Sequence, residues 1–322
     1  MEERLVIAAL DICRGRSIAI QSNCHGTRKQ GDTVLNLYES VRINPDVKRL
    51  EIGDFLFAQY TCGVGDEKLG LWAPSDYLVN VVTGKKTWRT SEGTWSANPG
   101  ETLFFKKGAA VVNQHFEVDF CLLMFFIPDH FIRSTVREIA GSLEAVAATV
   151  TPIQSAARVK HDTALAAFFQ SMRIYFSGEE TPSEALLRLK LKELIVGLLT
   201  SGANPALAAY FRSVGENDAP PVREIMEANF LFNLSLEEYA QLCHRSLSSF
   251  KRDFQTHFHE PPGQWLLRKR LEHAAGLLRD GRMNVTEIAL ASGFEDVSHF
   301  SRVFKKRFSL SPLAYRQAPR AG

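Results

Sequence analysis

The chain lacks the features that mark several common classes of protein. No apolar run approaches the roughly 18 residues that a membrane-spanning helix requires. The first residues, MEERLVIAALDICRGRS, place acids before a short apolar stretch, which is unlike a secretory leader. We therefore expect a cytoplasmic protein that does not insert into a membrane.

Cysteine is scarce and widely spaced. The cysteines form no C-x-x-C pair, and their odd number leaves one unmatched in any disulfide framework. A disulfide scaffold and a zinc module are therefore disfavoured, and we expect reduced thiols. The five cysteines are Cys13, Cys24, Cys62, Cys121 and Cys243.

Motifs for common catalytic chemistry are also missing. The sequence contains no G-x-S-x-G turn, no P-loop and no G-x-G-x-x-G turn. His25, His115 and His130 are scattered and form no H-x-H pair, so a metal-binding barrel enzyme is only an alternative. We predict that the protein is not an enzyme and holds neither a cofactor nor a metal.

Charge of one sign is not in excess either. The 322 residues carry a formal net charge of +2 and are 45% apolar, as in an ordinary soluble protein. Any basic function must therefore be local. The length suggests two domains, each large enough to bury its own core.

The two halves of the chain have different hydrophobic periods. Residues 30–130 show β-branched and aromatic runs separated by turns such as Thr83-Gly84, which predicts an antiparallel barrel or sandwich. After Pro128 apolar residues recur at helical spacing. One row of leucines fits packing within its own domain, which we favour, or a dimer interface. This row is Leu187, Leu191, Leu194 and Leu198.

A polar stretch separates two helical regions. SVGENDAPP, residues 213–221, contains Gly215 and ends in two prolines, so we predict a linker that cannot continue a helix. From Val222 onward helical spacing continues without a strand pattern. We expect one domain at 1–212, β-rich to about 130 and helical over 131–212, and an all-α domain at 222–318.

The second helical region contains an internal repeat. Three phenylalanines spaced four apart in SFKRDFQTHF recur 50 residues later in HFSRVFKKRF, each followed by a proline and an aromatic ring. Upstream, EYA at 238–240 matches EIA at 287–289 at an offset of 49, so the copies differ by one residue of turn. The matched residues are Phe250, Phe254, Phe258, Pro262 and Trp265 in one copy, and Phe300, Phe304, Phe308, Pro312 and Tyr315 in the other.

Each copy fits the order helix, tight turn, helix, which makes a helix-turn-helix duplicated within one chain. Ser235 and Glu238 have the spacing of a capping box, and Gly293 is a turn residue free to take positive φ. The other helix caps are expected from Ser246, from Thr286 or a neighbour, and from Asp296 or Ser298.

The phenylalanines and the cations of each copy occupy different sides of one helix. Residues four apart share a side, so the rings are expected to bury against the partner helix and leave polar side chains outward. Residues 297–308 carry four cations and no acid, a face that suits DNA phosphates and gives an affinity that falls steeply with salt. The alternative of a basic helix on a membrane surface would not need a repeated partner helix.

Between the copies, PGQWLLRKRLEHAAGLLRDG predicts one helix that starts at Pro262 and stops at Gly281. About 18 residues at roughly 1.5 Å rise give on the order of 27 Å. This length is close to the roughly 34 Å between successive major-groove faces of DNA once helix radii are added. Such a spacer would let both second helices enter adjacent grooves.

Residues 284–316, NVTEIALASGFEDVSHFSRVFKKRFSLSPLAYR, resemble the second helix-turn-helix of the AraC/XylS family of bacterial transcription regulators. The family pattern runs roughly I-A-x-x-x-G-F-x-x-x-x-x-F-x-R-x-F-K-x-x-F-G-x-S-P-x-x-Y-R. The likeness extends more loosely back to residue 234. Ser309 and His244 depart from the pattern, because the family usually has glycine at these positions. Histidine tolerates left-handed backbone better than most residues.

The resemblance implies a sequence-specific DNA-binding regulator, usually an activator that touches RNA polymerase. The implied fold class is α+β, with an N-terminal cupin-like β barrel and following helices, and a C-terminal all-α domain of two helix-turn-helix motifs joined by a linker helix. NPGETLFFKKGAAVV, residues 98–112, also resembles the barrel of members that activate type III secretion genes and answer to protein partners.

By family position, ten residues are expected to face double-stranded DNA. Lys251 and Arg252 would donate to guanine or phosphate, and Gln255 would pair with adenine. Val297 would contact a thymine methyl, and Lys306 would lie toward phosphate. Each of the ten also has a simpler interpretation as part of a solvated helix face. The ten are Ser248, Ser249, Lys251, Arg252, Gln255, Val297, Ser298, His299, Arg302 and Lys306.

Two arginines of the spacer helix are further candidates. Arg268 and Arg270 would reach the DNA backbone between the grooves. Arg270, however, falls where the arginine of the family packs or pairs internally, so we favour a structural role for it.

The role of the N-terminal half stays open. It binds a small-molecule effector, or it binds a regulatory protein with no small-molecule ligand, or it forms a homodimer. Trp72, Trp88 and Trp95 would line an effector pocket, although aromatic residues in a barrel usually belong to the core. The alternative from another class is a cupin-type metal enzyme fused to a DNA-binding domain.

Overall fold

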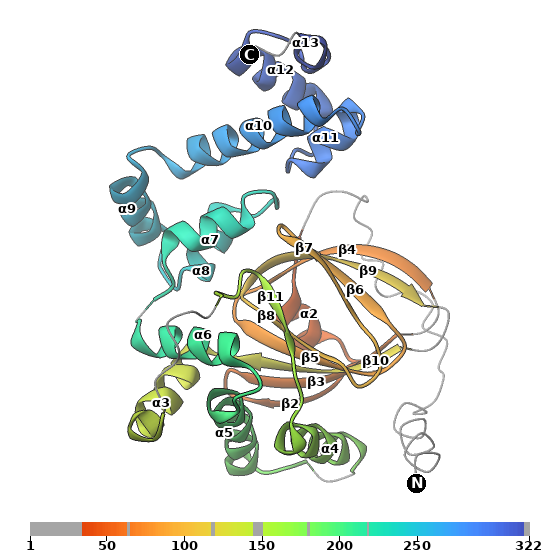
Figure 1. Cartoon of the computed structure of the whole chain (residues 1–322), viewed down its shortest axis with the longest axis vertical. Coiled ribbons are helices and arrows are strands. Elements are labelled where there is room, and N and C mark those ends of the chain that lie inside the picture. The colour runs from red at the N-terminus through yellow and green to blue at the C-terminus, as the bar shows by residue number, and fades with distance from the viewer. Residues whose placement is uncertain are drawn as a thin grey trace. The chain divides into compact units, whose positions relative to one another are not determined.

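The computed structural model describes residues 34–62, 65–116, 120–143, 151–178, 181–217 and 219–318 (Figure 1). The described residues from Leu35 to Pro220 form one compact unit, and those from Pro221 onward form another. The first unit combines β-strands with helices, and the second is entirely helical. This is the α+β fold class expected from the sequence.

The strands of the first unit form two sheets. The order in one sheet is β1-β4-β9-β6-β7, and in the other it is β11-β8-β5-β10-β3-β2. All pairings are antiparallel except that of β1 with β4. The strands are β1 (Leu35–Asn36), β2 (Lys48–Ile52), β3 (Phe55–Cys62), β4 (Gly65–Ala73), β5 (Asp76–Thr83), β6 (Lys86–Thr90), β7 (Gly93–Ala97), β8 (Thr102–Phe105), β9 (Gly108–Phe116), β10 (Phe120–Ile127) and β11 (Ala156–Val159).

The six-stranded sheet is covered on both faces. On β10, Leu122, Met124 and Phe126 join the cluster between the two sheets. The alternate residues Leu123 and Phe125 join a second cluster shared with the helices. Successive side chains of a strand point to opposite faces, and both faces of this sheet are covered. Every residue of β10 is therefore buried, and its sequence is an uninterrupted apolar run.

Helices cover the outer face of this sheet (Figure 1). The predicted leucine row of α5 is fully buried in the cluster beneath them, so it belongs to the domain core and not to a dimer interface. The helices of this unit are α2 (Leu37–Ile43), α3 (Asp129–Ile139), the 3-10 turn η1 (Ala140–Ser142), α4 (Thr163–Ser177), α5 (Glu184–Thr200) and α6 (Pro205–Glu216).

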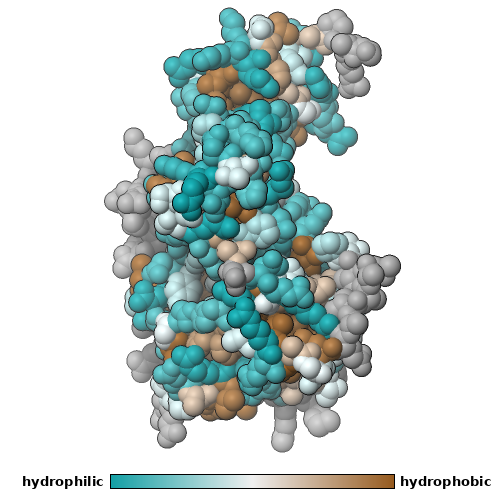
Figure 2. All heavy atoms as spheres, turned by 90° about the vertical axis from the view of Figure 1, so that its left-hand side faces the viewer, coloured by the Kyte–Doolittle hydropathy of each residue, from teal (hydrophilic) through white to brown (hydrophobic). Residues whose placement is uncertain are grey.

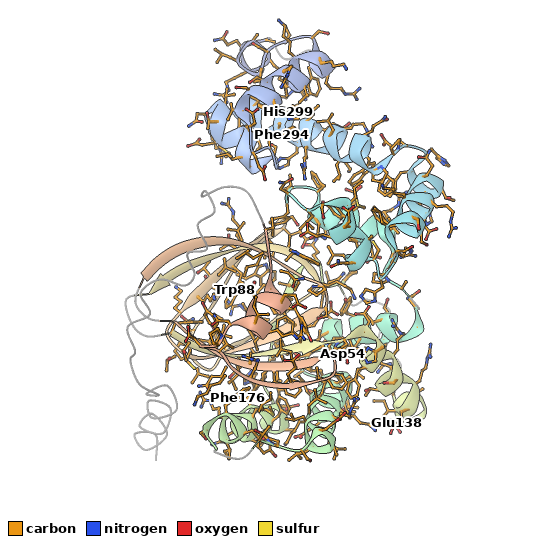
Figure 3. All side chains as sticks on the ribbon, turned by 180° about the vertical axis from the view of Figure 1, so that it is seen from behind. Asp54, Trp88, Glu138, Phe176, Phe294 and His299 are labelled. Atoms are coloured by element: carbon orange, nitrogen blue, oxygen red, sulfur yellow. The ribbon has the colours of Figure 1, made fainter. Side chains whose placement is uncertain are left out.

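The tryptophans of the barrel are core residues. Trp88 is buried between the sheets and Trp95 packs against the same cluster (Figure 3). Trp72 is also buried, at 3% exposure. The default expectation for barrel aromatics is therefore confirmed for these three side chains.

The predicted linker at 213–221 is wrong in its first half. Helix α6 continues through Glu216, although the sequence there is polar and contains Gly215. A Cβ built at Gly215 would lie 2.6 Å from Cγ1 of Val136 on α3, so the absence of a side chain lets the two helices touch. The helical part of the first unit also contains a strand, β11, which the sequence periodicity missed.

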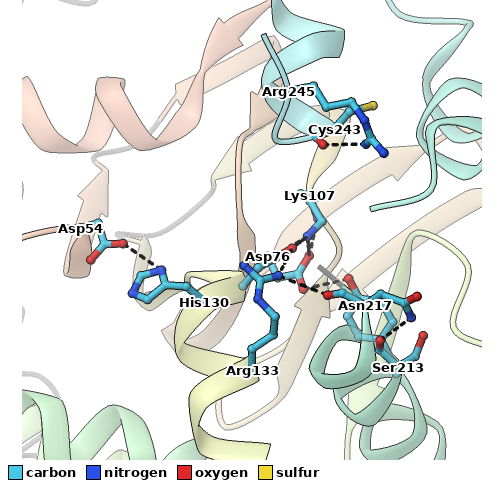
Figure 4. A network of polar contacts seen from close by, with 11 residues as sticks. Asp54, Asp76, Lys107, His130, Arg133, Ser213, Asn217, Cys243 and Arg245 are labelled. Carbon is cyan, nitrogen blue, oxygen red and sulfur yellow. Dashed lines mark hydrogen bonds and ion pairs between the residues drawn. The ribbon is translucent and has the colours of Figure 1, made fainter. Parts of the chain in front are cut away.

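A buried ion cluster joins the barrel to its helices (Figure 4). Nζ of Lys107 lies 2.5 and 2.6 Å from the carboxylate oxygens of Asp129, which begins α3. Asp76 accepts the backbone N–H of Lys107 at 2.8 Å and the hydroxyl of Tyr210 on α6 at 2.9 Å. Burial raises the pKa of the Asp76 carboxyl above its ordinary value, and the lysine opposes this rise. The cluster therefore ties both helices to the strands.

The second unit consists of short helices around one long helix. No single helix in the described ranges is long and apolar enough to cross a membrane; α5 and α6, bent by 117°, pass that test only as a pair. The helices of this unit are α7 (Val222–Asn229), α8 (Leu236–Leu242), α9 (Leu247–Phe258), α10 (Pro262–Asp280), α11 (Val285–Ala291), α12 (Val297–Phe308) and α13 (Pro312–Gln317).

Removing the lysine of the buried ion cluster should destabilise the protein. We expect Lys107→Met to lower the free energy of unfolding by about 3–5 kcal/mol, because two carboxylates lose their buried cation. Urea titration of the full-length protein measures the change. Lys85→Met, at an exposed position of the same barrel, is the matched control and should change stability little. If the two substitutions lowered stability equally, the buried ion cluster would not be the source of the effect.

Candidate nucleic-acid interface

The first helix-turn-helix is formed by α8 and α9. Ser235 and Glu238 form the predicted capping box at the start of α8, and Ser246 caps α9. Between the helices, His244 has φ of 53°, in the left-handed region. The histidine thus adopts the backbone conformation for which the family pattern has glycine.

The second helix-turn-helix is formed by α11 and α12. Asn284, a neighbour of the predicted Thr286, caps α11 with Glu287 as its capping-box partner. Gly293 has the predicted positive φ, at 80°. Asp296 caps α12 by accepting the backbone N–H of Ser298, and backbone hydrogen bonds hold its pKa below the ordinary value. The cap is therefore charged at neutral pH.

The extra residue of the second copy lies in its turn. His244 corresponds to Gly293 at an offset of 49, whereas the next caps, Ser246 and Asp296, correspond at an offset of 50. The turns use different chemistry to hold the second helix. In the first, Nε of Arg245 donates to Asp253 at 2.8 Å; in the second, the equivalent Phe294 and Val303 belong to one apolar cluster.

A row of rings fixes the inner side of each second helix. Phe250 and Phe254 are fully buried on α9, as Phe300 and Phe304 are on α12. The third phenylalanine of each row is half-buried and lies under the aromatic ring that follows it. The centroid of Phe258 lies 5.2 Å from that of Trp265, and Phe308 lies 5.2 Å from Tyr315. The aromatic rows therefore hold one side of each helix against its own motif, as predicted.

The outer sides of α9 and α12 carry the predicted DNA-facing residues. Eight of the ten are exposed and Ser249 is half-buried. The tenth, Val297, is also half-buried and packs against the apolar cluster of its motif, so its side chain is partly engaged within the protein. His299 lies next to Phe294 at the start of α12, with ring centroids 6.2 Å apart (Figure 3).

Two exposed residues at matching positions were not among the ten. Thr256 on α9 corresponds to Lys306 on α12, and Lys305 corresponds to Gln255, both at the offset of 50. The offset of the repeat could have predicted both residues, because each corresponds to one of the ten. Thr256 is exposed and donates its hydroxyl to the carbonyl of Arg252 at 3.0 Å.

The charge of the two second helices differs. Helix α9 carries Lys251, Arg252 and Asp253, a net charge of +1 without histidine, whereas α12 carries four cations and no acid. The Arg252 side chain is 78% exposed and lies 3.8 Å from Asp253. On α12, Arg307 turns toward Glu272 of α10, at 4.0 Å. All four cations of α12 are exposed, and Arg302, Lys305 and Lys306 are the three that do not turn toward Glu272.

The two spacer arginines have partners within the protein. Arg268 pairs with Glu260 at 2.7 Å and Glu272 at 3.2 Å. Arg270 is half-buried and donates to three backbone carbonyls, which agrees with the structural role favoured for it. Helix α10 itself runs over the predicted residues and ends at Gly281, whose φ is 77°.

The structure places two of the three histidines singled out from the sequence, and they lie on separate elements. His130 lies 3.3 Å from Asp54 on the surface, His115 falls in β9, and His25 lies outside the described residues. Within the described ranges, no group of three or more His, Cys, Asp or Glu residues is arranged to hold a metal ion. The one face of the molecule that Figure 2 shows is largely hydrophilic, with hydrophobic residues in separate groups.

Both halves of the chain match known protein families. Residues 76–210 match the ExsA N-terminal regulatory domain, and residues 239–318 match a helix-turn-helix domain. The virulence regulon transcriptional activator VirF of Yersinia enterocolitica is 24% identical over 241 residues, which is 75% of this chain and 89% of VirF. The transcriptional regulator ExsA of Pseudomonas aeruginosa is 24% identical over 237 residues, covering 74% of this chain and 84% of ExsA.

In both units the chain matches regulators of the AraC/XylS family. It is a DNA-binding transcription regulator with a regulatory N-terminal unit and a helix-turn-helix C-terminal unit. Among solved structures, ToxT from Vibrio cholerae covers 82% of this chain and 98% of its own, with 15% identity and a TM-score of 0.38.

The left-handed residue at the end of α12 yields a test of the fold. Ser309 has φ of 62° where the AraC/XylS pattern has glycine. We expect Ser309→Gly to raise the free energy of unfolding by about 0.5–1 kcal/mol, because glycine removes the strain of a Cβ in this conformation but loses more chain entropy. Urea titration followed by circular dichroism measures the change. Ser309→Ala retains the Cβ and is the control; an equal gain from both substitutions would refute this explanation.

Proposed function

We propose that this protein activates transcription by placing α9 and α12 in successive major grooves of one operator. The observation that carries the proposal is the repeated helix with a buried aromatic row inside and exposed polar or cationic side chains outside. The related VirF, described as a transcriptional activator, supports the sign of regulation. The protein would act in the cytoplasm, where it would also contact RNA polymerase.

The ten predicted residues, with Thr256 and Lys305, would form the DNA-facing surface. Three cations of α12, Arg302, Lys305 and Lys306, would supply much of the salt-dependent affinity through phosphate neutralisation. Helix α9, with fewer charges and with Ser248, Arg252 and Gln255 exposed, would contribute relatively more of its contacts to base edges. Val297 would contribute least, because part of its side chain is used in packing.

The N-terminal unit would receive the regulatory signal and form a homodimer. Its match to the ExsA regulatory domain supports a signal-receiving role, and the signal would be either a small molecule or a protein. Trp72 and Trp88 are buried, and Trp95 is half-buried against the apolar cluster between the sheets, so we favour a protein signal read at the surface over an aromatic-lined pocket.

Two substitutions on α12 separate base reading from phosphate contact. We expect Arg302→Ala to weaken binding to the specific operator by about 1–3 kcal/mol and to relax the preference at one base pair. We expect Lys306→Ala to weaken binding to all sequences and to reduce the slope of log K against log salt by about 1. Operators identified by genomic mapping, titrated at several salt concentrations, provide the measurement.

Arg307→Ala is the matched control for both substitutions. It removes the same charge from α12, but its side chain turns toward Glu272 of α10. Arg307→Ala should therefore change the base preference and the salt slope less than the other two substitutions do. If Arg302→Ala has the same base preference and the same slope of log K against log salt as wild type, Arg302 does not contact DNA.

The nature of the signal can be decided by thermal stability. A ligand that binds the folded protein alone raises its melting temperature as its concentration rises. If the signal is a protein, we expect no melting shift from a metabolite library and a stable complex with a partner protein. A concentration-dependent shift with one compound would instead establish a small-molecule effector.

A further inference from the structure

The middle of α10 connects the two helix-turn-helix motifs through one arginine. Nε of Arg270 donates to the carbonyl of Phe230 at 2.7 Å, and Nη2 donates to the carbonyl of Phe232 at 2.7 Å. Both carbonyls follow α7, in the first motif's part of the unit. Nη1 donates to the carbonyl of Gly293, in the turn of the second motif, at 3.1 Å. One rigid, planar side chain thus holds backbone from both sides.

The same two segments also touch directly. A Cβ built at Gly293 would lie 2.8 Å from the carbonyl oxygen of Leu231 and 3.0 Å from Nε of Arg270, so only glycine permits this approach. Further along, the side chain of Asn233 donates to Glu295. We call residues 230–233, Arg270 and residues 293–295 the brace.

The brace adds a second connection beside the long helix. A single helix fixes the length between two bodies, but small bending and twisting at its ends change their mutual angle. A second connection, made of backbone hydrogen bonds at its centre, restricts both motions. A change of one base pair between two half-sites moves the second by about 3.4 Å and rotates it by about 34–36°. Both the distance and the rotation between α9 and α12 therefore matter for operator choice.

We propose that the brace sets the number of base pairs that this protein accepts between the half-sites of its operator. Arg270 is then a positioning residue, which determines spacing without touching DNA. The inference rests on the proposed function, because it requires both second helices to bind one duplex.

Two variants weaken the brace to different degrees. Arg270→Gln removes the central side chain of the brace and takes the arginine donor from the carbonyls of Phe230, Phe232 and Gly293, so its fold must be checked by circular dichroism and thermal melting. The double variant Asn233→Ala with Glu295→Ala removes only the outer contact between exposed residues and leaves the core intact. Arg268→Ala is the matched control: it removes an arginine from the same helix, but one that pairs with Glu260 and Glu272.

The experiment is selection of binding sites from random duplex DNA by each full-length protein, followed by sequencing. We expect wild type and Arg268→Ala to enrich two half-sites at one spacing. We expect both brace variants to enrich the same half-sites at several spacings. Inserting one base pair into the wild-type site should weaken wild-type binding on the order of tenfold, and variant binding about threefold or less.

Three results would count against these inferences in different ways. If the folded brace variants keep one spacing as strictly as wild type, the brace does not determine it, and the proposed function stands. If Arg268→Ala broadens the spacing equally, the effect comes from lost charge and the brace is refuted. If wild type enriches no paired half-sites, the proposed function fails, and the inference about spacing fails with it.

Discussion

Burial of the aromatic rows on α9 and α12 is the constraint on which the C-terminal unit depends. Each row anchors one side of its helix by burying two phenylalanines completely and part of a third beneath Trp265 or Tyr315. A large apolar area is removed from water at a few positions, so the opposite side needs no apolar residues for stability. That side is therefore free to carry serine, glutamine, arginine and lysine for DNA.

The two motifs reach the same geometry with different side chains. The first turn has a histidine in the left-handed region and an ion pair between Arg245 and Asp253. The second has glycine and an apolar contact at the equivalent positions, with Phe294 buried. Salt screens the part-exposed ion pair of the first turn, whereas the apolar contact of the second turn carries no charge to be screened. Sequence divergence between the copies has therefore changed how the turns are held and how much charge each helix carries, while the aromatic rows are the same.

In the N-terminal unit, the stabilising element is a sheet that is covered on both faces. The strands β5 and β10 are buried on both faces, so the helices α3 to α6 are integral to the core. The ion cluster of Asp76, Lys107 and Asp129 adds directional contacts where α3 and α6 meet the strands. Displacing either helix from the strands would therefore disturb this cluster.

Features that depend on residues close together along the chain could be predicted from the sequence alone. The capping box of Ser235 and Glu238, the positive φ of Gly293, the span of α10 and the aromatic rows all follow from spacings of a few residues or from the repeat. Contacts between residues that are far apart in the sequence became visible only in the tertiary structure. Helix α6 continues past the predicted boundary because Gly215 meets Val136, and Arg270 binds carbonyls 23 to 40 residues away. Val297 packs inward because its place on α12 faces the apolar cluster of its motif. Local spacing predicts a helix and its apolar side. The carbonyls that Arg270 binds and the side chain that meets Gly215 are distant in the sequence, so these contacts exist only once the chain has folded.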